Sequence, residues 1–112
     1  TIMSFDFNVS KLDNDADFAT EHFNLFGYIS KAEQEQCKSW QWLKEHYKDE
    51  FGDIDYFYNI PVEITMDVET FNDFIKLYIE DYNKFLPSER KLTLKDFGDG
   101  LKPGDDVFVC WG

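Results

Sequence analysis

The sequence predicts an α+β fold: a small, mostly antiparallel sheet with about three helices packed on one of its faces. Three observations support this prediction. Residues near the N-terminus alternate between apolar and polar, as in a half-buried strand. Residues 68 to 85 repeat apolar side chains at helical spacing. The C-terminal segment combines a tight turn with a second alternating run. Strands and helices do not alternate regularly, which argues against a parallel sheet.

The first two elements are predicted as a strand and a helix. The apolar residues of the first alternating run are Met3, Phe5, Phe7 and Val9. Asp13 or Asn14 is a suitable N-cap for a helix that extends to about Phe26, with Gly27 as its stop. We therefore expect a strand to about Val9 and then a short helix.

A second helix is predicted from Ser30 to about Tyr47. Ser30 and Glu33 have the spacing of a capping box. Trp40 belongs to the apolar stripe of this helix, but Trp42 lies about 200° from it around the helix axis. Trp42 is therefore either an exposed interface anchor or a side chain packed under a neighbouring loop.

The middle of the chain is predicted to contain an acidic turn and an edge strand. Residues 49 to 55, DEFGDID, hold four acidic residues around Gly52. Residues 55 to 65 are rich in β-branched and aromatic side chains and favour one or two strand segments. Because Pro61 cannot donate a ladder hydrogen bond, it indicates an edge or a bulge.

The longest periodic segment predicts a helix over residues 68 to 85. Asp67 is the expected N-cap, and Pro87 is the expected stop. The apolar stripe consists of Val68, Phe71, Ile75, Tyr78, Tyr82 and Phe85.

Two further strands are predicted after this helix. Leu92, Leu94 and Phe97 indicate a weak one. Residues 102 to 105 have the sequence of a tight turn, with proline and glycine at its centre. Residues 107 to 111 then alternate again and predict the closing strand.

Length and charge bound the function. A chain of 112 residues is expected to form one domain, residues 1 to 112. It carries 23 acidic and 11 basic residues, a formal net charge of −12. Such a surface repels nucleic acid and anionic membranes and attracts basic protein patches. The alternative is that the charge serves solubility alone.

Cysteine usage and hydropathy favour a cytoplasmic protein. Cys37 and Cys110 are too few for a disulfide framework and are expected to be small core residues, although a single bridge between them is the alternative. Neither a leader sequence nor an apolar run long enough to span a membrane is recognised.

The sequence provides no pattern of a catalytic, metal or cofactor site, so we expect neither an enzyme nor a cofactor. Asp13, Asp15 and Asp17 resemble the start of a calcium loop, but Phe18 stands where glycine is needed and Asn24 where glutamate is needed. We assign the three aspartates to helix capping.

The histidines also fit no known site. His22 and His46 have no metal-ligand spacing. Cys37 lies about 13 Å from His46 along the predicted helix, too far for proton transfer. For this reason a small enzyme or a metal-binding domain ranks only third among the hypotheses.

The leading hypothesis is a monomeric acidic protein that occupies the basic nucleic-acid-binding surface of another protein. Carboxylates one helical turn apart are about 6 Å apart, close to phosphate spacing in nucleic acid. In size, acidity and aromatic content the chain is similar to bacterial and phage DNA-mimic proteins and to immunity proteins that neutralise nuclease toxins. An immunity protein is the second hypothesis. The candidate partner-binding residues are Asp49, Glu50, Asp53, Asp55, Glu69, Asp73, Glu80, Trp42, Tyr56 and Tyr58.

Overall fold

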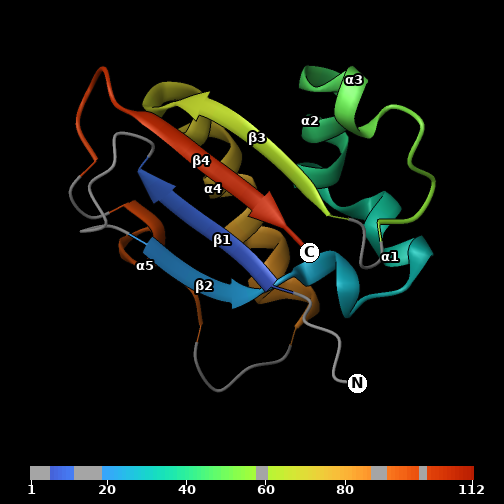
Figure 1. Cartoon of the computed structure of the whole chain (residues 1–112). Helices are drawn as coiled ribbons and strands as arrows, with labels where there is room; N and C mark the ends of the chain where they lie inside the picture. Colours follow the sequence, from blue (N-terminus) through green and yellow to red (C-terminus); the bar gives the residue numbers. More distant parts are fainter. Residues whose placement is uncertain (1–5, 12–18, 58–60, 87–90, 99–100) are drawn as a thin grey trace.

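The computed structural model describes residues 6–11, 19–57, 61–86, 91–98 and 101–112. Within these ranges it shows a four-stranded antiparallel sheet with helices on one face, which confirms the predicted α+β class (Figure 1). The strands are β1 (Asp6–Lys11), β2 (Ala19–Phe23), β3 (Val62–Asp67) and β4 (Asp106–Trp111). Their order across the sheet is β2-β1-β4-β3, so β2 and β3 are the edges.

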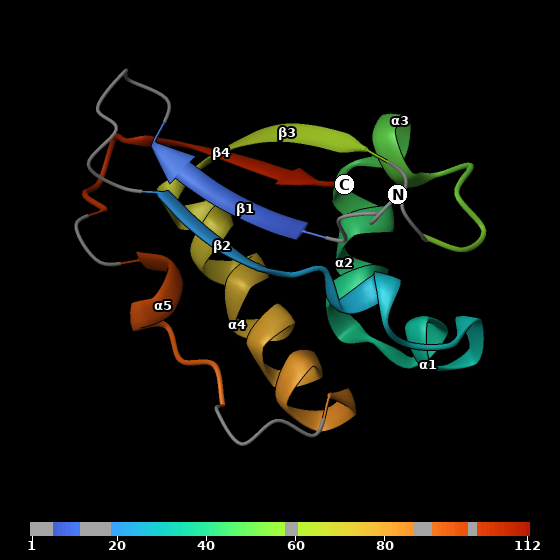
Figure 2. The ribbon, with the colours of Figure 1, turned by 60° about the horizontal axis from the view of Figure 1, so that its bottom comes forward.

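The two faces of the sheet differ in polarity. Phe7 pairs with Trp111 and Ile64 with Val109, and all four side chains are buried beneath the helices. Figure 2 shows α4 and α5 on this side of the sheet. The other face is more exposed and more polar. Its described side chains are Asn8, Ser10, Glu63, Thr65, Asp67, Asp106, Phe108 and Cys110.

The long helix has the predicted boundaries. Helix α4 (Val68–Phe85) begins after Asp67, whose carboxylate accepts a hydrogen bond from the Thr70 amide at 2.7 Å. This hydrogen bond lowers the pKa of Asp67. Leu86 caps the other end, and Pro87 lies outside the described residues.

The predicted helix from Ser30 to Tyr47 is interrupted. The capping box of Ser30 and Glu33 is confirmed, but the segment forms α1 (Lys31–Gln36) and α2 (Lys38–His46). Cys37 lies between them with extended dihedrals, φ −72° and ψ 125°. Cys37 and Ser39 are both buried, yet a continuous helix would place them about 200° apart. The break allows both to face the core.

Two predicted elements are wrong. Residues 19 to 23 of the predicted first helix form β2, and a 3-10 helix, η1 (Leu25–Gly27), follows. Pairing of β2 with β1 outweighs the weak local helical pattern. Residues 13 to 18 and the side chains of Met3 and Phe5 lie outside the described residues.

The predicted strand around Leu94 is also wrong, because residues Lys95–Gly98 form the single helical turn α5. The Asp96 carboxylate accepts a hydrogen bond from the Thr93 amide at 2.8 Å, which favours a turn over an extended chain. Phe97 is fully buried.

The remaining strand predictions hold in part. Of the described residues in the predicted segment 55 to 65, residues 62 to 65 belong to β3, which continues to Asp67; β3 is an edge strand, as Pro61 indicated. The acidic segment is partly helical, because α3 (Lys48–Phe51) includes its beginning. The turn before β4 is confirmed, with Gly104 at φ +94°.

Candidate partner-binding surface

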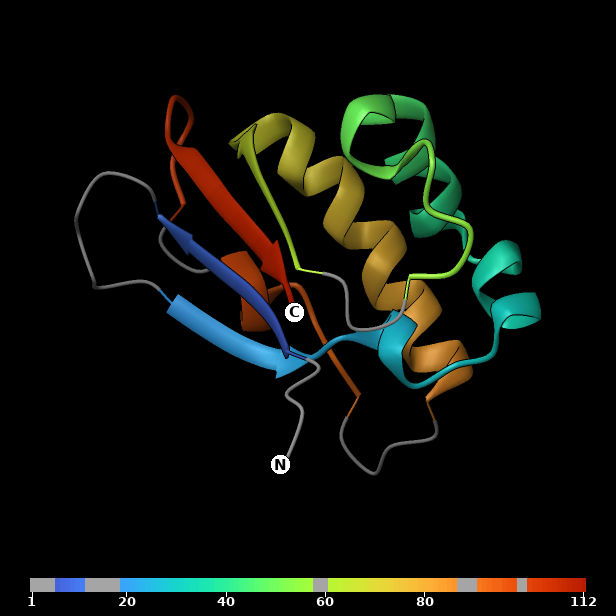
Figure 3. The same ribbon diagram turned by 45° about the vertical axis from the view of Figure 1, so that its right-hand side comes forward.

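Helices α2 and α3 form a lobe that packs on α4 and also on β4, where Phe51 contacts Trp111 with ring centroids 5.6 Å apart. Helix α2 runs antiparallel to α4, because Ser39 contacts Asp81 whereas Trp42, further along α2, contacts Phe74 (Figure 3). The buried Asp81 carboxylate accepts hydrogen bonds from the amide of Ser39 at 2.8 Å and from its hydroxyl at 2.5 Å. This contact sets the position of α2 and of the segment that follows it.

The acidic lobe consists of Asp49, Glu50, Asp53 and Asp55, all of which are exposed. Residues 49 to 55 contain these four acids and no basic residue, a local charge of −4. Asp55 is partly neutralised, because Lys31 approaches its carboxylate at 2.6 Å. That hydrogen bond and charge lower the pKa of Asp55 and raise the pKa of Lys31.

The second group of candidate acids lies on the exposed ridge of α4. Glu69, Asp73 and Glu80 are exposed there, as expected. Lys76 and Lys84 lie on the same ridge and are also exposed. Three acids and two lysines leave this ridge a local charge of −1, so it is a weaker candidate than the acidic lobe.

The structure separates these two groups. The ridge is opposite the buried face of α4 and therefore points away from the sheet. Figure 2 shows α3, the start of the acidic lobe, near the level of the sheet.

The candidate aromatic residues are less exposed than an anchor requires. Trp42 is partly buried against Phe74, with ring centroids 5.5 Å apart, and the His46 ring stacks on it at 4.1 Å. Trp42 is therefore packed, against α4 rather than under a loop. Tyr56 is partly buried, and its hydroxyl donates a hydrogen bond to the Ile29 carbonyl. Tyr58 lies outside the described residues.

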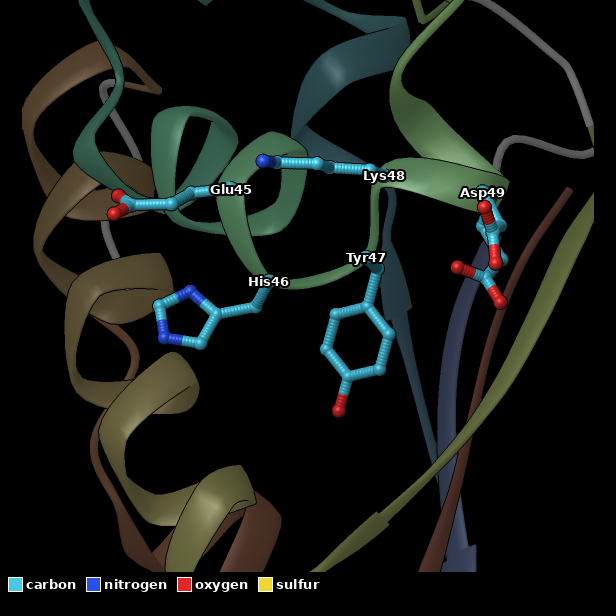
Figure 4. A pocket seen from close by; sticks show the side chains of 6 residues that line it. Glu45, His46, Tyr47, Lys48 and Asp49 are labelled. Atoms are coloured by element: carbon cyan, nitrogen blue, oxygen red, sulfur yellow. The ribbon is translucent and has the colours of Figure 1, made fainter.

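Tyr47 is an additional surface residue that the sequence analysis did not select. Its pKa is raised by burial and by the charges of Asp67 and Glu50. Figure 4 shows the Tyr47 ring beside the His46 ring, pointing away from the junction of α2 and α3. The sequence analysis named Tyr47 only as the end of the second predicted helix, so no local pattern identified it as a surface residue.

A shallow depression is formed by residues 45 to 50 at the junction of α2 and α3. Figure 4 shows Glu45 and Asp49 on opposite sides of it, with the rings of His46 and Tyr47 between them. Nδ1 of His46 lies 2.9 Å from the Trp42 carbonyl oxygen. Carboxylates beside an aromatic ring suit a lysine or arginine side chain.

Among the described residues, no group of three or more histidine, cysteine or acidic side chains is arranged to hold a metal ion. The Asp13, Asp15 and Asp17 triplet lies outside those residues. No helix in the described ranges is both long and apolar enough to cross a membrane.

Both cysteines are free thiols. Cys37 is buried as predicted, whereas Cys110 on β4 is partly exposed. Burial, with a smaller contribution from Asp81, raises the pKa of Cys37 to about 12, well above its ordinary value of 9.0. Cys37 is therefore a protonated core residue.

We expect Cys37 at pH 8 to react with a thiol reagent at least about a thousandfold more slowly in the native protein than in the protein unfolded in urea. The raised pKa lowers the fraction of Cys37 present as the reactive thiolate in the native state by roughly that factor. A Cys110→Ser variant isolates this rate, and Cys37→Ser isolates the faster reaction of Cys110. Equal rates for Cys37 in native and unfolded protein would contradict its burial.

The raised pKa of Cys37 also means that the native state retains the thiol proton at a pH where the unfolded chain loses it. The free energy of unfolding should therefore fall as the pH rises above about 9.

Comparison of the chain with protein-family models, curated proteins and solved structures finds no match. The functional argument therefore depends on the residues and their geometry.

Proposed function

We propose that the protein is a non-enzymatic acidic binding protein of the DNA-mimic type. It occupies the basic nucleic-acid-binding surface of a partner, such as a nucleoid protein or another DNA-binding protein, and inhibits or modulates DNA binding there. The observation that supports this proposal most directly is the acidic lobe, four exposed carboxylates within seven residues without an intervening base. The net charge of −12 extends the same field over the whole chain.

Electrostatics favour a basic protein as the partner. A protein surface that binds DNA carries lysine and arginine side chains positioned for phosphates, and carboxylates on a folded lobe can pair with them. Long-range attraction speeds association, and its dependence on salt distinguishes charge pairing from apolar docking. The free thiols fit a reducing cytoplasm, which is the location we propose.

Affinity capture from a lysate of the source organism tests this function. The immobilised protein is loaded at low salt and eluted in steps of rising salt. Release of nucleoid or other DNA-binding proteins at moderate salt supports the DNA-mimic proposal. A single partner that resists high salt favours an immunity protein instead. Retention of no basic protein contradicts both.

Neutralising Asp53 and Asp55 together, as Asp53→Asn with Asp55→Asn, should weaken partner binding by about tenfold. Two lost charge pairs contribute roughly 1.4 kcal/mol in total. Both side chains are exposed, and loss of the surface ion pair between Lys31 and Asp55 should change the free energy of unfolding only slightly. Calorimetric titration of the captured partner measures the affinity.

The matched control is Glu35→Gln with Asp106→Asn, which removes the same charge from exposed positions outside the acidic lobe. This control should weaken binding by less than about twofold. Equal losses in both double variants would mean that net charge matters and that the acidic lobe is not the contact.

A further inference from the structure

Strand β3 has an open backbone edge. It pairs with β4 on one side only, because it is the last strand in the order β2-β1-β4-β3. Among the described residues, none outside the sheet forms a hydrogen bond with the backbone of residues 62 to 66. Alternate amide and carbonyl groups along this edge are therefore available for another strand.

This edge lacks two of the features that usually block strand addition, a bulge and a lysine. Its register with β4 is unbroken over six consecutive pairs, so no bulge distorts it. Pro61 precedes the strand and leaves its amides intact. Glu63, Thr65 and Asp67 are exposed, whereas Ile64 and Met66 are buried on the helical side. Lysine, the usual edge-blocking residue, does not occur in β3.

The charges on β3 disfavour a second copy of this chain. In an antiparallel pair of two β3 strands with Thr65 opposite Thr65, each Glu63 would face Asp67 of the other copy. Like charges directly opposite each other destabilise a strand pair, whereas lysine or arginine opposite the same acids stabilises it. The edge is therefore complementary to an extended basic segment.

The open edge is next to the acidic lobe. Figures 1 and 3 show α3, which holds Asp49 and Glu50, beside β3 on the side away from β4. A chain paired with β3 would lie on the side of the strand that faces α3. The edge and the lobe can thus contact one partner.

We propose that β3 binds an extended segment of the partner protein as an added strand, with lysine or arginine side chains opposite Glu63 and Asp67. This inference rests on the proposed function, which supplies a basic partner. It adds a recognition element: backbone pairing fixes the register of the segment, and the acids select its charge.

The test uses a short synthetic peptide in which lysine and threonine alternate. The control peptide has the same side chains but carries a methyl group on every backbone nitrogen, which removes its hydrogen-bond donors. We expect the first peptide to slow amide hydrogen exchange in β3, measured by NMR, and the methylated peptide to leave it unchanged. Equal binding of both peptides, or no slowing in β3, would overturn the added-strand model.

Charge on the edge is tested with Glu63→Lys. Reversal of this exposed charge should weaken binding of the unmethylated peptide by about tenfold, because attraction becomes repulsion. Glu35→Lys makes the same change at an exposed position on α1, outside both groups of candidate acids, and should weaken it by less than about twofold. Equal effects of the two reversals would also count against the edge.

Lysate capture separates failure of this inference from failure of the proposed function. If Glu63→Lys retains the basic partner as well as the unaltered protein does, while the Asp53 and Asp55 double variant loses it, the β3 inference fails and the proposed function stands. If the unaltered protein retains no basic protein and the peptide does not bind, both fail.

Discussion

Replacing Asp81 with alanine is expected to lower the free energy of unfolding by about 3 kcal/mol. The carboxylate is 5% exposed and accepts hydrogen bonds from the amides of Lys38 and Ser39, at 3.3 and 2.8 Å, and from the Ser39 hydroxyl. Alanine would leave the buried donors of Ser39 without this partner, and each such donor costs roughly 1 to 3 kcal/mol. Urea denaturation measures the change.

The size of this effect follows from the way α2 begins. Its N-cap residue, Cys37, makes no side-chain capping bond, so Asp81 from α4 takes the place of a local cap. A negative charge at this position also interacts favourably with the helix dipole. One side chain therefore both caps α2 and attaches it to α4.

Two variants make the Asp81 prediction specific. Asp81→Asn retains an acceptor oxygen and should cost about half as much as alanine. Asp73→Ala removes the same charge from an exposed position on the same helix and should change the free energy of unfolding by less than about 0.5 kcal/mol. Equal losses for Asp73→Ala and Asp81→Ala would mean that helix charge, not the buried hydrogen bonds, explains the result.

Local patterns were sufficient to predict the elements that bury a regular face. Helix α4 has a long apolar stripe and its own N-cap, so both ends could be predicted. The turn at Gly104 and the alternation of β4 are equally local. These elements required no information about their neighbours.

Elements that depend on distant partners could not be predicted. Strand β2 has little alternation and is defined by its pairing with β1. The start of α2 is capped by Asp81, which is 42 residues from Ser39. Propensity and spacing describe only the segment in which they are read, so a cap supplied by another helix leaves no local pattern.

The candidate surface shows the same division. The exposure of the four acids in the acidic lobe could be expected from their composition. The pairing of Asp55 with Lys31, 24 residues earlier, could not. The packing of Trp42 on Phe74 also required the antiparallel arrangement of α2 and α4. Charge is a property of composition, whereas its arrangement is a property of the fold.

The largest loss of stability is expected for Phe7→Ala, about 4 kcal/mol. Phe7 is fully buried and stacks on Tyr78 with ring centroids 4.5 Å apart. It also contacts Trp111 at 5.0 Å and Phe97 at 5.7 Å, so it joins β1 to β4, α4 and α5. Alanine would remove the ring and leave a cavity that these large side chains fill only in part, and such changes cost roughly 3 to 5 kcal/mol.

Phe108→Ala is the control for the Phe7 prediction and a test of the two faces of the sheet. Phe108 lies on β4 but points to the open face and is only partly buried. Its loss should cost about 1 kcal/mol, because much of the ring already contacts solvent. Urea denaturation of both variants measures the difference. Similar losses would mean that the polar face is also packed in solution. Strand β3 would then lie at the edge of a sheet that is covered on both faces. An added basic segment would have less room beside it.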